Sequence, residues 1–294
     1  QGAGALVRNN VGRKDKTIWS AKGMGAPIQL HLVEDERAEA ALVAETIAGS
    51  QRAGYAWQDT AVLYRVNAQS RAIEEALRMA RIPYDIIGGL RFYDRREIKD
   101  AVAYLRLVAN PLNNQAFRRI VNVPARGIGD ASLVKLDEAA ARHGCALLEA
   151  CARAEIREEF PARAGQALQA FAGLIQTLHE QAVQLSVPDC IRLVLGRTGY
   201  RQLWSAEGSK EGQDRVDNLE ELVASAAEYQ AEHPGATLAA FLDTVSLMSE
   251  VDEQRDGMHV TLMTLHAAKG LEFPLVFMTG LEEGILPHER ALLD

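Results

Sequence analysis

VTLMTLHAAKGLEFPLVFMTGLEEGILPH, residues 260–288, contains two apolar runs separated by a polar turn. The runs, 260–264 and 274–279, have the short length and the β-branched or aromatic residues of buried parallel strands. Buried parallel strands occur in α/β proteins, whose helices cover the faces of the sheet. This stretch therefore predicts an α/β fold.

The polar turn between the two runs carries three reactive side chains, His266, Lys269 and Glu272. Polar groups at strand ends are where α/β sheets bind ligands. Gly270 lets the backbone turn sharply or approach a ligand closely, and Lys269 supplies a point positive charge suited to phosphate. An ordinary strand-turn-strand connection would give the same pattern, because Lys-Gly is common in loops. Residue chemistry alone leaves both interpretations open.

Two more segments have strand and helix signals in alternation. In 61–77, AVLYRVNAQSRAIEEAL, a short apolar run precedes a helix capped by Asn67. In 82–107, IPYDIIGGLRFYDRREIKDAVAYLRL, residues 84–87 predict a strand, and a helix capped by Asp94 follows the two glycines. Repeated strand-helix units support the α/β prediction.

An earlier strand-helix pair is predicted at residues 26–33 and 34–48. Asp35 and Glu36 follow the predicted strand and superficially resemble a magnesium-binding acidic pair. Such a pair needs a phosphate-binding loop, and the sequence contains no GxxxxGK[ST]. We therefore interpret the two carboxylates as a helix N-terminus, where negative charge is favourable.

The three blocks 61–77, 82–107 and 260–288 closely resemble motif IV, the segment after it and motif V of superfamily 1A DNA helicases of the UvrD, PcrA and Rep type. Members of that family couple ATP hydrolysis to movement along single-stranded DNA. The resemblance implies a partial RecA-like second motor domain with a parallel sheet, interrupted by an all-α accessory domain.

The segment Arg126-Gly-Ile-Gly-Asp130 opens a long region of helical patterns. A GxG turn between helices allows backbone amides to approach a DNA phosphate. It resembles the RGIG segment by which the accessory domain of these helicases touches duplex DNA. Helices are predicted at 161–184, 188–199, 212–232 and 238–250. The predicted parts are the tail of a preceding motor domain (1–25), the second motor domain in two pieces (26–120 and 257–294), and the accessory insertion (121–256).

The net charge of −8 is unusual for a protein that binds DNA, but it is unevenly distributed. Residues 65–135 carry 13 Lys and Arg against 7 Asp and Glu, a net of +6, whereas residues 137–256 carry 10 against 21, a net of −11. The basic region favours DNA contact there, although charged residues most often only solvate helix faces.

Composition excludes several classes. No apolar run reaches the roughly 18 residues of a membrane span, and no signal-peptide pattern is present. Cys145, Cys151 and Cys190 form no CxxC pair, which indicates free thiols in a reducing cytoplasm and predicts no metal site.

The resemblance assigns nucleotide-binding roles to four residues. It implies that Tyr64 stacks on adenine and that Arg65, the predicted catalytic residue, reaches the γ-phosphate of ATP. Glu272 would accept from a ribose hydroxyl, and Lys269 would link DNA contact to the nucleotide. The alternatives are a core position for Tyr64 and a surface salt bridge from Arg65 to Glu74 or Glu75. The Mg²⁺ ligands are expected outside this chain.

The remaining predicted contacts are to DNA. Thr264 and His266 would face the strand backbone, with a satisfied loop histidine as the alternative for His266. Basic and aromatic residues interleave at 91–96, as in single-strand sites, although capping and core packing could explain the aromatic ones. The predicted DNA-binding set is Thr264, His266, Arg91, Phe92, Arg95, Arg96, Arg126, Gly127, Ile128, Gly129 and His288.

The predicted function is part of a 3′–5′ DNA helicase acting in repair or replication. Its partners would be single-stranded DNA, single/double-strand junctions, the first motor domain and repair or replication proteins. Without the phosphate loop, the magnesium acids and the arginine of motif VI, we expect this fragment alone to be inactive. The alternatives are a non-catalytic DNA-binding or protein-interaction module, and the motor of a helicase-nuclease.

Overall fold

A computed structural model describes residues 26–250 and 258–286, and the chain divides into two compact units, Gln1–Glu34 and Asp35–Asp294. In the first unit, residues 26–33 form no regular secondary structure, so the strand predicted there is wrong. The side chains of Ile28 and Leu32 are 93% exposed. Alternating apolar residues make a stable strand only when a neighbouring strand and a core are available to them. The predicted motor-domain tail, 1–25, lies outside the described residues.

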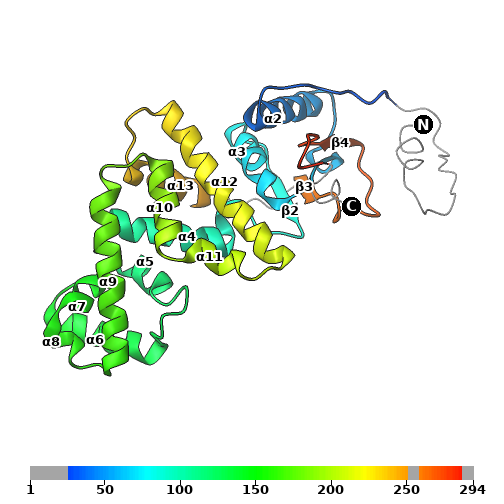
Figure 1. Ribbon diagram of the computed structural model, residues 1–294. Helices are drawn as coiled ribbons and strands as arrows, with labels where there is room; N and C mark the ends of the chain where they lie inside the picture. The colour runs from blue at the N-terminus through cyan, green and yellow to red at the C-terminus, as the bar shows by residue number, and fades with distance from the viewer. Residues whose placement is uncertain (1–25, 251–257, 287–294) are drawn as a thin grey trace. The chain divides into compact units, whose positions relative to one another are not determined.

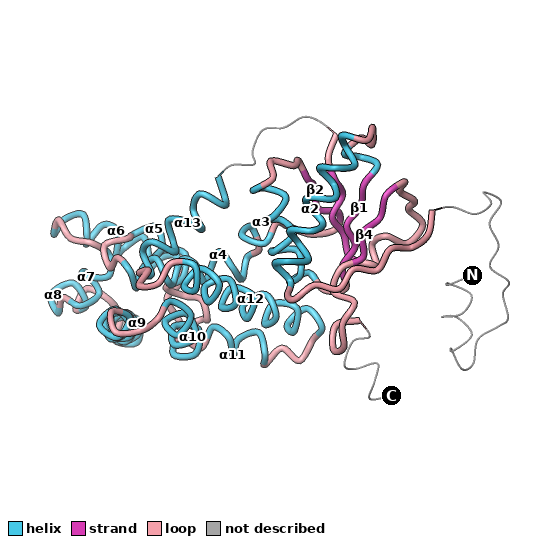
Figure 2. The backbone as a smooth tube through the Cα atoms, turned by 90° about the horizontal axis from the view of Figure 1, so that it is seen from above, coloured by secondary structure: helices cyan, strands magenta, loops and turns pink. Residues whose placement is uncertain are grey.

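The second unit contains a four-stranded, all-parallel sheet (Figures 1 and 2), which confirms the α/β prediction. The strands are β1 (Thr60–Tyr64), β2 (Tyr84–Ile87), β3 (Val260–Thr264) and β4 (Leu275–Met278), in the order β2-β3-β1-β4. β3 therefore lies between two strands that precede it by about 170 residues or more. The helical insertion leaves the sheet after β2 and returns beside it.

The two strands of the opening motif differ in burial. In β3, Val260 and Leu262 are fully buried. β4 is an edge strand, and on it Val276 and Met278 are about half exposed, so the prediction of a buried strand is wrong for β4. An edge strand pairs on one side only, and here one of its faces also lies open.

Helices α2 (Glu36–Arg52) and α3 (Ser70–Met79) pack on each other and share one apolar core with the sheet. The carboxylate of Asp35 caps α2 by accepting from the amide of Ala38 at 2.8 Å, which confirms that this acidic cluster is a helix N-terminus. The predicted cap Asn67 instead begins a 3₁₀ turn, η2 (Asn67–Gln69), which precedes α3.

The remaining helices form a second body with its own apolar core. The helices predicted at 161–184, 188–199, 212–232 and 238–250 are confirmed. They correspond to α9, α10, α12 and α13. The helices of this body are α4 (Arg96–Ala109), α5 (Asn114–Ile120), α6 (Asp130–His143), α7 (Leu147–Ala152), α8 (Ala154–Arg157), α9 (Ala162–Ala182), α10 (Val187–Arg197), α11 (Tyr200–Ser205), α12 (Lys210–Glu232) and α13 (Leu238–Glu250).

The apolar core of the helical body begins before residue 121, where the accessory insertion was predicted to start. Helix α4 packs against α5, α9, α12 and α13, and its side chains Leu105 and Leu107 are fully buried there. The prediction that Asp94 caps this helix is wrong: Arg95 holds the cap position, and Asp94 forms an ion pair with Lys99 at 2.6 Å. In packing terms, α4 belongs to the helical body.

A polar seam joins the two cores: Arg71 and Glu75 on α3, Arg95 before α4, and Asn218, Glu221 and Glu228 on α12. Arg71, whose side chain is 1% exposed, reaches all three glutamates, at 2.9 Å from Glu75, 2.5 Å from Glu221 and 2.8 Å from Glu228. These carboxylates raise the pKa of Arg71 although burial alone would lower it. Ion pairs, more than apolar contacts, fix the position of α12 on α3.

Candidate nucleic-acid interface

Arg65 and His266 meet at the carboxyl edge of the sheet, just after two neighbouring strands. Arg65 follows β1, and His266 lies in the turn after β3. A guanidinium nitrogen of Arg65 lies 3.1 Å from Nδ1 of His266. The two residues come from sequence blocks 200 positions apart, and the parallel register of β1 and β3 places their ends together. In the described part of the chain, Arg65 forms no salt bridge to Glu74 or Glu75, which was the predicted alternative.

Gln69 holds the turn that carries Arg65. Its side-chain oxygen accepts from the amides of Arg65 at 2.9 Å and Val66 at 3.0 Å. Its amide nitrogen lies against Gly280 after β4, where an added Cβ would come within 1.8 Å of it. The Gly280 amide also donates to the carboxylate of Glu39 on α2 at 3.0 Å. Polar contacts thus fix the ends of β1 and β4 to each other and to α2.

We expect Gly280→Ala to destabilise the protein by about 1–3 kcal/mol, since a non-glycine residue at φ 67° is strained and the new methyl group collides with Gln69. Urea unfolding would measure the loss. Gly49→Ala, on α2, is the control, because a Cβ there meets no atom within 4 Å. Equal free energies of unfolding for the two variants would show that the turn accommodates the methyl group.

The turn after β3 exposes the polar side chains that the sequence singled out. His266, Lys269 and Glu272 are all exposed. The Thr264 hydroxyl accepts from the amide of Ala267 at 3.3 Å and so shapes the first bend of the turn. Gly270 has φ 88°, a left-handed conformation that favours glycine. The turn therefore presents a cation, an imidazole and a carboxylate to solvent.

Tyr64 occupies the core. Its side chain is 1% exposed, and its hydroxyl has no hydrogen-bond partner among the described residues. Burial raises the pKa of this phenol, and the nearby Glu74 carboxylate adds to the shift. A ring without an exposed face cannot stack on adenine, so the structure supports the core interpretation of Tyr64.

The basic and aromatic segment at 91–96 is largely internal, which corrects the prediction of a stacking surface. Phe92 is 1% exposed. Arg95 is buried and donates to Ser70 at 2.7 Å, to Asn218 at 2.8 Å and to the carbonyl of Leu90. Arg91 is half-buried, with its guanidinium 5.4 Å from the ring of Tyr84. Of the four predicted contacts in this segment, Arg96 alone is exposed.

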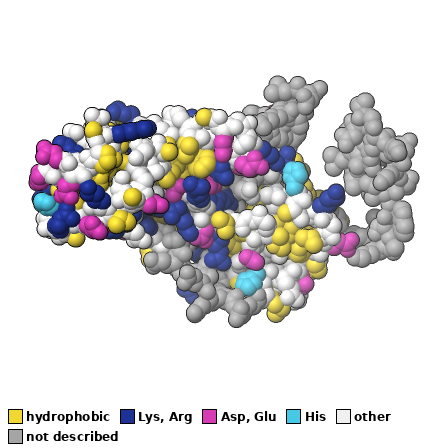
Figure 3. Space-filling model, turned by 90° about the horizontal axis from the view of Figure 1, so that it is seen from below, with side chains coloured by type: hydrophobic (Ala, Val, Ile, Leu, Met, Phe, Trp, Pro, Cys, Tyr) yellow, Lys and Arg dark blue, Asp and Glu magenta, His cyan; other side chains and the backbone are white. Residues whose placement is uncertain are grey.

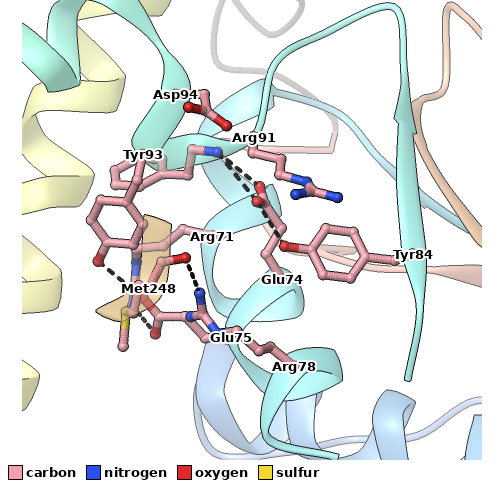
Figure 4. A pocket seen from close by; sticks show the side chains of 10 residues that line it. Arg71, Glu74, Glu75, Arg78, Tyr84, Arg91, Tyr93, Asp94 and Met248 are labelled. Carbon is pink, nitrogen blue, oxygen red and sulfur yellow. Dashed lines mark hydrogen bonds and ion pairs between the residues drawn. The ribbon is translucent and has the colours of Figure 1, made fainter. Parts of the chain in front are cut away.

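A buried carboxylate positions this segment. Glu74 accepts from the Tyr84 hydroxyl at 3.3 Å and the Phe92 amide at 3.2 Å (Figure 4). It also accepts from the Ser70 hydroxyl at 2.6 Å. Burial raises the pKa of Glu74, and these donors oppose the shift. Beside it lies a cavity of about 10 Å³, space for a single water molecule at most. The cavity is a packing detail of the seam, too small for a ligand.

The RGIG turn divides into an internal and an exposed half. Arg126 and Ile128 face inward: the Arg126 guanidinium donates to backbone carbonyls, and Ile128 is 1% exposed. The side chain of Asn122 accepts from the amides of both residues. The predicted side-chain contacts of Arg126 and Ile128 with DNA are therefore corrected to structural roles. Gly127 and Gly129 remain exposed.

The exposed faces carry charges of both signs. In Figure 3, Lys and Arg side chains gather near the middle of one face among Asp and Glu. Within residues 26–250 and 258–286, no group of three or more His, Cys, Asp and Glu is placed to hold a metal ion. None of the described helices is both long and apolar enough to span a membrane. Predicted contact His288 lies outside the described residues.

The three cysteines are free, as predicted. Burial raises the pKa of Cys151 to about 12 and that of Cys190 to about 11. Thiols with such pKa values stay protonated near neutral pH and are poor nucleophiles. Cys151 and Cys190 therefore serve as core residues of the helical body.

Comparison with known proteins gives matches over almost the whole chain. The model of the UvrD-like helicase C-terminal domain matches residues 2–293. Proteins named ATP-dependent DNA helicase PcrA are 41% identical over 300 residues in Bacillus subtilis (strain 168) and 41% over 301 residues in Leuconostoc citreum. The PcrA of Staphylococcus aureus (strain Mu50 / ATCC 700699) is 38% identical over 292 residues. Each alignment covers 99% of this chain and 40% of the relative.

Proposed function

This chain belongs to the UvrD-like helicase C-terminal domain family, and on that premise we propose that it forms part of an ATP-dependent motor that moves 3′–5′ on single-stranded DNA. The chain spans about 40% of the length of the PcrA relatives. We propose that a nucleotide binds between this sheet edge and a first motor domain, and that the motor unwinds duplex at junctions in repair or replication.

The contact between Arg65 and His266 is the observation that carries the assignment of the DNA face. Arg65 and His266 lie 3.1 Å apart at one edge of the sheet, and we propose that both contact the same phosphate region. The family resemblance implied that Arg65 contacts ATP and that His266 contacts DNA. Because Tyr64 offers no ring to adenine, the nucleotide assignment of its neighbour loses its support. We therefore assign both residues, with Thr264, to the DNA strand.

The chain's residues fit a nucleotide in part. Lys269 exposes a cation suited to phosphate, and Glu272 exposes a carboxylate that can accept from a ribose hydroxyl. We assign these two residues to the nucleotide side of the turn after β3. When bound with Mg²⁺, ATP supplies the free energy of movement. Glu272 follows the left-handed bend at Gly270, whereas Lys269 and His266 both precede it.

In the complete helicase, we expect Arg65→Ala to weaken single-stranded DNA binding by about 10–100-fold, since charge-assisted hydrogen bonds contribute about 1.5–3 kcal/mol. The slope of log K against log salt should become shallower by about 0.7 for one lost phosphate contact. Fluorescence anisotropy at several salt concentrations measures both quantities, without nucleotide.

Two variants control this measurement. Arg65→Lys keeps the charge and should retain most of the salt slope. Arg192→Ala removes an exposed arginine of α10, which pairs with Asp189, and should change little. Unchanged DNA affinity in Arg65→Ala together with abolished ATP turnover would refute the DNA assignment and return Arg65 to the γ-phosphate.

We also propose that the exposed glycines of the RGIG turn approach the backbone of duplex DNA. Gly129 has an extended backbone at φ −84°, and an added Cβ there meets no atom within 4 Å. Gly129→Thr should therefore fold normally, because threonine and glycine are similar N-caps. We expect it to weaken binding of a blunt duplex several-fold and to leave single-strand binding unchanged. Equal losses on both DNAs would contradict a duplex-specific contact.

A further inference from the structure

A second cationic site lies in the helical body, in a cavity of about 280 Å³ bounded by α4, α5 and α13. Its floor is apolar, with Val102 and Val245 buried at 7% and 3% exposure. Three basic side chains line it: Lys99 and Arg106 from α4, and Arg119 from α5. Among the residues that the structure describes, those that line the cavity include no carboxylate, so every charged side chain in the lining is basic.

Of these three basic residues, Arg106 alone has no carboxylate partner among the described residues. Lys99 pairs with Asp94 at 2.6 Å, and Arg119 pairs with Asp100 at 2.8 Å. The side chains of Lys99 and Arg119 are 45% and 39% exposed, whereas the Asp100 side chain is buried at 5% exposure. Arg106, half-buried between them, has one described hydrogen bond, to the neutral hydroxyl of Ser246 at 2.9 Å. A guanidinium has five donors, so most of those of Arg106 remain for a ligand.

Two other arginines of this fold have several of their hydrogen-bond donors paired with protein acceptors. Arg71 meets three carboxylates, and Arg126 meets backbone carbonyls and a tyrosine hydroxyl. A guanidinium that is partly desolvated beside two further cations gains from an anion. The planar guanidinium of Arg106, with Lys99 lining the same cavity, suits a phosphate group, because a phosphate accepts several charge-assisted hydrogen bonds.

We propose that this cavity binds a backbone phosphate of duplex DNA, through Arg106 with Lys99 and Arg119. The inference rests on the proposed duplex contact of the RGIG turn. α5 connects the cavity to the RGIG turn. Its residue Arg119 lines the cavity, and the chain continues from the end of α5 through residues 121–125 to the turn. Gly127 lies eight positions after Arg119, a stretch that spans at most about 29 Å, or about eight phosphates of one strand along the duplex axis. One duplex strand can therefore reach both sites.

The test is duplex binding by the complete helicase, measured by anisotropy across a range of salt. The Lys99→Gln/Arg106→Gln double variant should lower duplex affinity at least tenfold and make the salt slope shallower by about 1–2. Arg106→Lys, which keeps the charge, should stay close to the wild-type slope. The matched control is Arg192→Gln/Arg201→Gln, which removes two exposed cations of α10 and α11 that pair with Asp189 and Glu220.

Gly129→Thr separates this proposal from the duplex contact itself. If Gly129→Thr weakens duplex binding while the double variant matches its control, the cavity proposal fails and the turn contact stands. If neither variant affects duplex binding, both fail. Thermal melting with inorganic phosphate adds an independent readout: phosphate should raise the Tm of the wild type and not that of the double variant. A lost phosphate effect with unchanged duplex binding would overturn the assignment to DNA.

Discussion

Arg71→Ala is expected to lower the free energy of unfolding by about 3–5 kcal/mol, the usual cost of removing one partner from a buried ion pair. The substitution leaves Glu75, Glu221 and Glu228 facing one another across the polar seam without their cation. Burial already raises the pKa of Glu221, and Arg71 opposes that shift. Without Arg71, the seam must admit water, take up protons or open.

Equilibrium unfolding in urea, followed by circular dichroism, measures the Arg71→Ala loss. Arg192→Ala is the control, because exposed ion pairs contribute only about 0–1 kcal/mol. Adding Glu221→Gln to Arg71→Ala should recover part of the loss, since one uncompensated carboxylate is removed. A loss below about 1 kcal/mol in Arg71→Ala, or no recovery in the double variant, would show that the seam is hydrated and does not fix α12 on α3.

Arg126→Ala is expected to lower the free energy of unfolding by about 2–4 kcal/mol, because five partly buried acceptors lose their donor together. The guanidinium lies over the ring of Phe171 at 5.0 Å and connects α5, the RGIG turn and the end of α10. Its hydrogen-bond acceptors are the carbonyls of Ile120, Val121, Pro124 and Thr198 and the hydroxyl of Tyr104.

Arg126→Lys distinguishes this structural role from a contact with DNA. Lysine keeps the positive charge but lacks the planar fork that reaches several acceptors. We therefore expect Arg126→Lys to lose most of the stability that Arg126→Ala loses, as measured by urea unfolding. Arg118→Ala, an exposed arginine of α5 that pairs with Asp137, is the control and should lose at most about 1 kcal/mol. A fully stable Arg126→Lys protein with weakened duplex binding would restore the DNA assignment.

The residues of the proposed DNA face show which site residues a sequence pattern can identify and which it cannot. His266, Lys269 and Glu272 were identified from a turn between two apolar runs, and all three are exposed at the carboxyl edge of a parallel sheet. Gln69 was missed because its role depends on accepting two amides and touching Gly280, a contact across 211 positions that carries no local signal. The contribution of Arg106 to a cavity was missed for the same reason.

The sequence by itself determined the α/β class, the position of most helices and the family, because apolar periodicity and long motifs are local properties. Only the tertiary structure decided which side chains face outward. Tyr64, Arg95 and Arg126 have the chemistry of ligand contacts, yet the fold buries Tyr64 and Arg95 and turns Arg126 inward. Arg95 donates to Asn218, 123 positions away, and Arg126 to Thr198, 72 positions away. Burial depends on the surface that packing covers, and β3 lies between β1 and β2 although the whole helical body, with its own core, separates it from them in the sequence.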